Sequence, residues 1–264
     1  MGVSLVAVDM DGTFLRPDMT YDRERFLALR QRMREVKIPF VVASGNQYWQ
    51  LRSFFDPSDD VAYAAENGHY LYEVGEETPF SVPTPRPKAA LEMISILEEK
   101  RVHYLVSTPQ GAFIPSWAPP KAIEWTKLYY PRSTVVEDVR KHANEVVRAS
   151  MVVEDPYSLV VEFQTLFSNG DFVPVVSGSE DLDLNARGHN KAVGLQALAK
   201  RWRVDLSEAI AFGDSHNDLE MLGAVGLPVA MDNAHSDVRN AAVRIAPSNF
   251  NDGVLEVLDE VLPR

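Results

Sequence analysis

Four aspartates in two short segments supply the clearest chemistry in this sequence. Asp9 and Asp11 stand two residues apart in DMDGTFL, directly after the apolar run LVAV. Asp214 and Asp218 lie in GDSHNDLEML, about two hundred residues further along the chain. Carboxylates that pack together raise one another's pKa and cost stability unless a cation offsets their charge. Mg²⁺, a hard cation that prefers oxygen ligands, fits such a set best.

Each acidic segment also has a purely structural explanation. Asp11 and Gly12 form a common turn pair. Asp218 follows Ser215 by three residues, ahead of Leu219 and Leu222, which resembles a helix capping box with Asp in place of Glu. The chemical explanation depends on whether other polar residues converge on the same place.

A lysine and a short polar segment add groups that suit an anion. Lys191 lies near the start of an expected helix over 190–202, where the helix dipole disfavours a cation. Because the same helix end attracts anions, a phosphate-binding lysine explains this position better than a surface lysine, which stays the alternative. Ser44 and Gly45 follow the apolar run FVVA and form either part of the same site or an ordinary turn.

Short apolar runs alternate with amphipathic helical patterns, which predicts an α/β fold on a parallel sheet. The runs are almost entirely apolar, as expected for strands with helices on both faces. The expected strands span residues 3–8, 40–44, 62–66, 209–213, 227–231 and 243–246. Helices are expected between the first two strands, over 190–202 and 216–225, and at the C-terminus. Ligands bind beyond the carboxyl ends of such strands, where the four aspartates are expected to converge.

The middle of the chain follows a different pattern. Three prolines spaced by two, Pro83, Pro85 and Pro87, predict a stiff connector. The expected helices beyond it lie near 88–100 and 119–129, and the expected strands lie within 103–108, 146–154, 158–164, 172–179 and 181–186. We therefore predict an α+β domain inserted at 83–187. Residues 1–82 and 188–264 are expected to fold together as one doubly wound core domain.

Composition restricts the partners. The net charge of −12 argues against a nucleic-acid partner, although a basic pocket for one small phosphate stays open. The absence of cysteine excludes disulfides, thiolate metal sites and cysteine nucleophiles. The N-terminal residues lack the basic region of a signal peptide and the length of a membrane span. A cytoplasmic protein without a membrane partner is expected, and its oligomeric state is not predicted.

Together, DMDGTFL, ASGN, the Asn-Lys pair at 190–191 and GDSHNDLEML resemble the four motifs of the haloacid dehalogenase-like (HAD) phosphohydrolases. AENG at 65–68 and VAMDNA at 229–234 are similar to the Cof-type branch, subfamily IIB, which includes bacterial sugar phosphatases. The resemblance covers nearly the whole core and implies a Rossmann-like fold. The inserted segment resembles the C2B cap of the family by position and length.

The resemblance also implies roles for individual residues. Asp9 would be the nucleophile that forms an aspartyl-phosphate, and Asp11 would act as general acid and then general base. The Mg²⁺ site would comprise Asp9, Asp11 through its backbone carbonyl, Asp214 and, through water or neighbouring ligands, Asp218. The phosphate-binding residues would be Ser44, Gly45, Lys191 and Asn217.

The expected function is Mg²⁺-dependent hydrolysis of small phosphorylated metabolites, sugar phosphates in particular. The resemblance implies phosphoryl transfer, because the dehalogenases of the same superfamily lack the second acid that Asp11 supplies here. The alternatives are a phosphosugar mutase of the phosphomannomutase type, a phosphatase for pyridoxal phosphate or flavin mononucleotide, and a non-catalytic phosphate-binding protein. The last is disfavoured because Asp9, Asp11 and Lys191 are all present. Neither the substrate nor the cap residues that select it are predicted.

Overall fold

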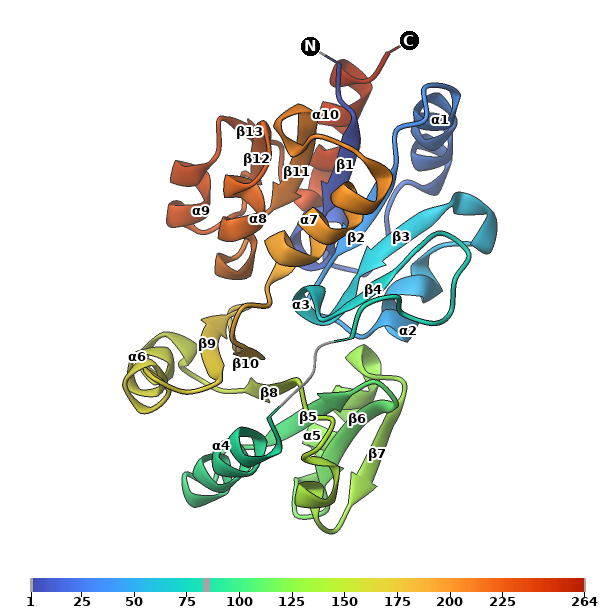
Figure 1. Cartoon of the computed structure of the whole chain (residues 1–264). Coiled ribbons are helices and arrows are strands. Elements are labelled where there is room, and N and C mark those ends of the chain that lie inside the picture. Colours follow the sequence, from blue (N-terminus) through green and yellow to red (C-terminus); the bar gives the residue numbers. More distant parts are fainter. Residues whose placement is uncertain (1, 83–85, 264) are drawn as a thin grey trace. The chain divides into compact units, whose positions relative to one another are not determined.

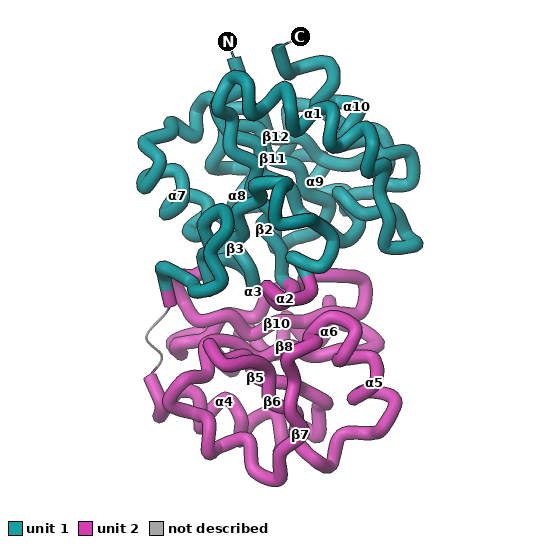
Figure 2. The backbone as a smooth tube through the Cα atoms, turned by 90° about the vertical axis from the view of Figure 1, so that its right-hand side faces the viewer, with its two compact units in different colours: residues 1–45, 51–81, 190–264 teal, residues 46–50, 82–189 magenta. Residues whose placement is uncertain are grey.

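The computed structural model describes residues 2–82 and 86–263, so Pro83 and Pro85 of the predicted connector lie outside the described residues. The chain divides into two compact units, shown in Figure 2. Unit 1 comprises residues 1–45, 51–81 and 190–264, and unit 2 comprises residues 46–50 and 82–189. The roles of a catalytic core and of a cap inserted at 83–187 stay predictions.

Unit 1 is built on a seven-stranded sheet with the order β13-β12-β11-β1-β2-β3-β4. Its strands are β1 (Leu5–Val8), β2 (Phe40–Ala43), β3 (Val61–Ala64), β4 (Tyr70–Tyr72), β11 (Ala209–Gly213), β12 (Leu227–Met231) and β13 (Arg244–Ala246). Neighbouring strands run parallel except β3 and β4, which are antiparallel. The six predicted strands are present, whereas β4 was not predicted.

Helices cover both faces of this sheet, so the predicted doubly wound α/β fold is confirmed (Figure 1). They are α1 (Arg23–Glu35), α3 (Ala65–Gly68), α7 (Lys191–Trp202), α8 (Leu219–Gly223), α9 (Ser236–Ala241) and α10 (Gly253–Val261). Helix α1 packs against α10, and α7 packs against α8 on the opposite face. The central strand β1 is fully buried on both sides, which explains why it is apolar throughout.

Short helical turns complete unit 1. They are η1 (Met10–Phe14), η2 (Arg52–Phe54), η3 (Pro57–Asp59), η5 (Leu206–Glu208), η6 (His216–Asp218) and η7 (Asn249–Asn251). Helix α2 (Tyr48–Leu51) includes residues of both units. Among the residues described, no helix is both long enough and apolar enough to cross a membrane.

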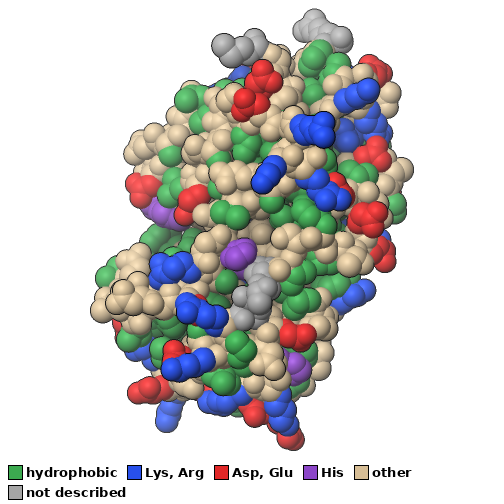
Figure 3. Space-filling model, in the orientation of Figure 1, with side chains coloured by type: hydrophobic (Ala, Val, Ile, Leu, Met, Phe, Trp, Pro, Cys, Tyr) green, Lys and Arg blue, Asp and Glu red, His purple; other side chains and the backbone are tan. Residues whose placement is uncertain are grey.

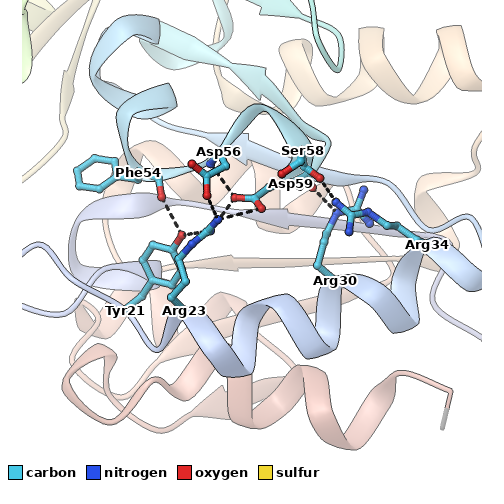
Figure 4. Close-up of polar contacts among 8 residues, drawn as sticks. All are labelled: Tyr21, Arg23, Arg30, Arg34, Phe54, Asp56, Ser58 and Asp59. Atoms are coloured by element: carbon cyan, nitrogen blue, oxygen red, sulfur yellow. Dashed lines mark hydrogen bonds and ion pairs between the residues drawn. The ribbon is translucent and has the colours of Figure 1, made fainter.

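A polar network ties the start of α1 to the segment that carries η2 and η3 (Figure 4). The guanidinium of Arg23 donates to Asp59 at 2.6 Å and to the Tyr21 hydroxyl at 2.9 Å. Tyr21 in turn donates to the backbone carbonyl of Phe54 at 2.7 Å. Arg30, which is buried, donates to the backbone carbonyl of Asp59 at 2.9 Å. These bonds tie the segment that precedes β3 to α1 and to Tyr21.

Unit 2 contains a six-stranded sheet with the order β7-β6-β5-β8-β10-β9. Its strands are β5 (Tyr104–Thr108), β6 (Gly111–Pro115), β7 (Ser133–Val136), β8 (Arg148–Val152), β9 (Phe172–Val176) and β10 (Asp181–Ala186). The pairs are antiparallel except β6 with β7. Its helices are α4 (Pro87–Glu99), α5 (Pro120–Tyr129) and α6 (Pro156–Leu166), with a short turn η4 (Val139–His142).

Residues 158–164 are helical, so the predicted strand there is wrong. The run LVV contains two β-branched valines, which favour a strand. Two signals outweigh it: Pro156 occupies the first turn, and the Asp155 side chain accepts a hydrogen bond from the Ser158 backbone at 3.0 Å. The resulting helix buries Phe163 completely in the main hydrophobic core of unit 2. Strands β6 and β7 were not predicted.

Candidate active site

Three strand ends deliver the predicted polar residues to one edge of the unit 1 sheet. Asp9 follows β1, Ser44 follows β2 and Asp214 follows β11, and these strands are parallel neighbours (Figure 1). The backbone N–H of Asp9 donates to the Phe212 carbonyl at 3.1 Å, which extends the β1–β11 pairing to the edge itself. The strand order therefore brings together residues that are far apart in the sequence.

Lys191 lies at the centre of the group. Its Nζ donates to Asp9 Oδ1 and to Asp218 Oδ1, each at 2.6 Å, and the side chain is fully buried. Helix α7 starts at Lys191 because Asn190 caps it, accepting a hydrogen bond from Val193 N at 2.9 Å. Burial alone would lower the pKa of Lys191, but Asp218 and Asp9 raise it, so the ammonium form is maintained.

The carboxylates around Lys191 carry more negative charge than one lysine neutralises. Asp9, Asp214 and Asp218 each offer an oxygen within 4.8 Å of the others. Burial raises the pKa of Asp9 well above its usual range, and Asp218 and Asp214 raise it further against the effect of Lys191. Burial, together with the charge of Asp218, raises the pKa of Asp214 to about 7. A cation at this group would therefore stabilise the ionised carboxylates.

The turn after β1 is shaped around Asp214. Thr13 Oγ1 donates to Asp214 Oδ1 at 2.6 Å, although the two residues are far apart in the sequence. Gly12 has φ 76°, and a Cβ atom there would lie 2.4 Å from Asp214 Oδ2. Glycine is thus required both by the backbone conformation and by the close approach. The Asn233 side chain donates to the Gly12 carbonyl at 2.8 Å and holds the turn from the other side.

Asp218 is both a helix-capping residue and a member of the charged cluster, so both interpretations of its position hold. Its Oδ2 accepts backbone hydrogen bonds from Asp214 and Ser215, both at 3.0 Å, and Ser215 and Asp218 form a capping box. Its Oδ1 accepts the hydrogen bond from Lys191. Since these bonds engage both oxygens, Asp218 orients Asp214 and Lys191 and is better suited to an indirect role at a metal than to direct ligation.

Asn67 belongs to this edge and was not predicted as a site residue. It follows β3 in AENG, where Glu66 and Asn67 have φ 50° and 56° in the left-handed region. Its side-chain oxygen accepts a hydrogen bond from Asn217 Nδ2 at 3.1 Å, and a Cβ atom on Gly45 would lie 3.4 Å from that oxygen. Its backbone N–H donates to the Ser44 carbonyl at 2.8 Å. Ser44, Gly45, Asn67 and Asn217 thus form a second group at the sheet edge.

Asp11 and the loop 185–189 differ from these groups. The carboxylate of Asp11 is not among the three mutually close carboxylates of the described residues, but its charge helps to raise the pKa of Asp214. Arg187 donates to the Gly170 carbonyl at 2.7 Å and to the Phe167 carbonyl at 3.1 Å within unit 2. Arg187 therefore supports the chain that follows α6 in unit 2.

The donor set fits a divalent metal ion that prefers oxygen. Asp9 and Asp214 contribute carboxylate oxygens, and burial together with the neighbouring carboxylates raises the pKa of both residues. Mg²⁺ typically binds one or two carboxylates and keeps several waters. When bound there, a divalent ion would neutralise charge and polarise the oxygens of an anionic substrate.

Comparison with known proteins identifies the family. The profile described as haloacid dehalogenase-like hydrolase matches residues 6–258. The chain is 37% identical to the 5-amino-6-(5-phospho-D-ribitylamino)uracil phosphatase YbjI of Escherichia coli, over 99% of this chain and 97% of that protein. It is 25% identical to the pyridoxal phosphate phosphatase YbhA of Escherichia coli, with 98% of each chain covered.

A comparison with solved structures finds the same fold over nearly the whole chain. The crystal structure of SMU.1108c from Streptococcus mutans matches with a TM-score of 0.91 at 28% identity, covering 98% of each chain. The matched region includes the strand ends that carry Asp9 and Asp214 and the helix start that carries Lys191. As the motifs predicted, the chain belongs to the haloacid dehalogenase-like hydrolases, and it is an enzyme of the phosphoric monoester hydrolase class.

Proposed function

We propose that this protein is a Mg²⁺-dependent phosphatase that hydrolyses small phosphorylated metabolites through an aspartyl-phosphate. The observation that carries the proposal is the buried contact of Lys191 with Asp9 and Asp218 beside Asp214. An ammonium group beside a buried carboxylate favours its ionised form against the effect of burial, and a bound Mg²⁺ would favour that form further, which prepares Asp9 as a nucleophile. The same ammonium attracts the phosphoryl oxygens of a substrate, which reduces their repulsion by Asp9.

The reaction would proceed in two steps. Asp9 attacks phosphorus and the bond to the leaving oxygen breaks, while Asp11 donates a proton to that oxygen. Water then attacks the aspartyl-phosphate, Asp11 accepts the proton of the water, and inorganic phosphate leaves with Asp9 restored. Asp11 suits this work because it lies in the turn stabilised by Gly12 and Asn233, two residues beyond the nucleophile.

The second group at the sheet edge would hold the phosphoryl oxygens. Ser44 offers a hydroxyl, Gly45 a backbone N–H and Asn217 a side-chain amide. The amide of Asn217 already donates to Asn67 at 3.1 Å, which fixes its orientation before a substrate binds. Preorganised donors of this kind stabilise the charge that develops on a transferring phosphoryl group.

The substrate class that we propose is a metabolite with its phosphate on a sugar or sugar-alcohol chain. The support is a relative 37% identical to this chain whose name specifies a phosphate on a ribityl chain. The prediction of sugar phosphates from the Cof-type motifs points to the same class. Pyridoxal phosphate, the substrate in the name of a more distant relative, is the main competitor.

The test is a screen for phosphate release. The panel holds hexose and pentose phosphates, a phosphorylated ribitylamino-pyrimidine, pyridoxal phosphate and flavin mononucleotide, each with Mg²⁺ or with a chelator. We expect fastest release from the sugar or ribityl phosphates, with no release under chelation. Fastest release from pyridoxal phosphate would contradict the substrate class, and formation of an isomeric phosphosugar without free phosphate would replace hydrolysis by mutase activity.

Asp9→Asn provides the matched control for the reaction itself. This substitution preserves the size and shape of the side chain but removes the nucleophilic charge. We expect no turnover of any panel member and no phosphate covalently trapped on the protein. Turnover comparable to that of the unsubstituted enzyme would contradict the proposed mechanism, whatever the substrate.

A further inference from the structure

Unit 1 also contains three side chains of metal-ligating types that have no role in the proposed reaction, namely His216, His235 and Asp237. His216 Nε2 lies 3.5 Å from Asp237 Oδ2, and His235 Nδ1 lies 3.8 Å from the same oxygen. The two imidazole ring centroids are 4.3 Å apart. One potential ligand atom from each of the three residues lies within 4.8 Å of the other two.

The fold holds these three side chains together from two segments. His216 begins η6, whereas His235 and Asp237 lie at the start of α9. The segments are joined by a backbone hydrogen bond from His235 N to the Asp214 carbonyl at 3.0 Å. The convergence therefore rests on the backbone of the active-site loop and not on flexible side chains alone.

Solvent reaches the group. The side chains of His216, His235 and Asp237 are 22%, 39% and 63% exposed. Figure 3 shows histidine beside acidic side chains at the surface of this part of unit 1, at the left of the view. An ion can therefore enter without any rearrangement of the fold, and water can fill the remaining coordination positions.

The separations suit a small transition metal ion. Tetrahedral Zn²⁺ with ligands at about 2.0–2.1 Å places neighbouring ligand atoms about 3.3 Å apart. The separation from His216 to Asp237 is near this value, and that from His235 to Asp237 needs a shift of about half an ångström. His235 Nδ1 also accepts a hydrogen bond from Asp237 N, but at 3.4 Å this bond is long and weak.

Ligand chemistry separates this group from the carboxylates at the sheet edge. Imidazole suits Zn²⁺ and similar transition metals, whereas Mg²⁺ selects oxygen and water. We propose that His216, His235 and Asp237 form a binding site for a divalent transition metal ion, with Zn²⁺ as its representative, and that this site is separate from the Mg²⁺ site. A bound ion would link η6 to α9 and thereby hold the loop that presents Asp214.

The test is a Zn²⁺ titration of the whole protein against a chromophoric chelator in excess Mg²⁺, which occupies the carboxylate site. We expect one Zn²⁺ per chain. His235→Ala and Asp237→Asn should each weaken binding by more than about tenfold, because even loss of a residue that only supports a metal ligand costs about that much. His103→Ala, which removes an exposed histidine of unit 2, should leave the affinity unchanged.

Two further measurements decide the site. Asp214→Asn should retain the Zn²⁺ affinity, since that ion would not use the carboxylate group; loss of binding in this variant would place Zn²⁺ at the sheet edge and overturn the proposal. Equal affinity in the unsubstituted protein and in Asp237→Asn would overturn it as well. Asp237→Asn keeps the size of the side chain, so it decides the question even where His235→Ala fails to fold, and Co²⁺ absorption bands report the imidazole ligation directly.

Discussion

Both units of this protein bury a cation against carboxylates, but the two clusters are built differently. In unit 1, Lys191 donates to Asp9 and Asp218 at the carboxyl edge of a parallel sheet. In unit 2, Arg148 on β8 donates to Asp183 on the neighbouring strand β10 at 2.9 Å. Each cation is almost completely buried.

The surroundings of the two cations explain the difference. Arg148 also contacts neutral hydroxyl groups, those of Tyr130 at 2.8 Å and Ser150. Lys191 instead shares its cluster with a further carboxylate, Asp214, whose pKa burial raises to about 7. A matched ion pair with neutral neighbours contributes to the specificity of packing, whereas a cluster with excess negative charge is unstable without a ligand. Excess charge, and not burial of a cation, therefore distinguishes the candidate active site.

Asp9→Asn tests this distinction with the largest expected effect. We expect phosphatase activity to fall by at least about a thousandfold, since loss of a catalytic nucleophile costs that much or more. We also expect the metal-free variant to unfold at the same or a higher urea concentration, because one of the crowded carboxylates loses its charge. Asp183→Asn in unit 2 should do the opposite by lowering stability, since it leaves Arg148 buried without its carboxylate. A destabilised Asp9→Asn variant would contradict the excess of negative charge.

Lys191→Met removes the cation from the same cluster. The free energy of unfolding of the metal-free protein should fall by about 3–5 kcal/mol, because the buried carboxylates of Asp9 and Asp218 lose the cation that they share. Equilibrium urea unfolding measures this change. Lys200→Met, at an exposed position of the same helix, is the matched control and should change stability by less than about 0.5 kcal/mol. Equal losses in the two variants would mean that Lys191 acts only through the helix.

The two clusters also differ in how far the sequence predicts them. Asp9 and Lys191 were predictable because each residue type is unusual at its position, a carboxylate at the end of a buried strand and a cation at a helix start. Asn67 was not, since Asn and Gly after a strand indicate an ordinary turn. Its contact with Asn217 depends on a left-handed backbone and on strand order, neither of which shows in local spacing.

In unit 2 the sequence was less informative. Asp183 alternates with apolar residues, as any half-exposed strand would, and its ionic partner Arg148 lies on another strand. The helical residues 158–164 were mistaken for a strand because β-branched residues outweighed the cap formed by Asp155. The helix that this cap begins places Phe163 in the core of unit 2. Motifs that serve chemistry thus restrict the sequence locally, whereas a packed sheet can be built from many sequences.

The next prediction concerns how Asp214, the additional carboxylate of the unit 1 cluster, makes the free energy of unfolding depend on pH. In the metal-free folded protein Asp214 keeps its proton up to about pH 7, against an ordinary pKa of 3.8. Between these values the folded state binds more protons, so this residue makes the free energy of unfolding fall as pH rises, by up to about 1.4 kcal/mol for each pH unit. Because other carboxyl groups titrate too, the measurement is the difference between the unsubstituted protein and Asp214→Asn in urea unfolding from pH 4 to pH 7.

Saturating Mg²⁺ supplies the control for that difference. Metal binding requires the ionised carboxylate, so with Mg²⁺ present the stability of the unsubstituted protein relative to Asp214→Asn should rise instead of fall as the pH increases from 4 to 7. The same experiment with Asp183→Asn should show no Mg²⁺ dependence. A Mg²⁺-independent difference at Asp214 would argue that the raised pKa reflects burial without a metal site.

The smallest effect is expected when both charges of unit 2 are removed together. Arg148→Met alone should cost about 3–5 kcal/mol, because Asp183 is left buried without its partner. In Arg148→Met with Asp183→Asn, Ser150 keeps a side-chain acceptor at position 183 and a contact with Tyr130, 3.1 Å away. The double variant should therefore unfold within about 2 kcal/mol of the unsubstituted protein, since neutral replacement of a buried pair is often tolerated. If the double variant is as unstable as Arg148→Met, the pair is not exchangeable for neutral residues.

Lys191→Met with Asp218→Asn is the corresponding double change in unit 1. There we expect phosphatase activity to stay lost even if stability is recovered, because the reaction needs the charge of Lys191 itself.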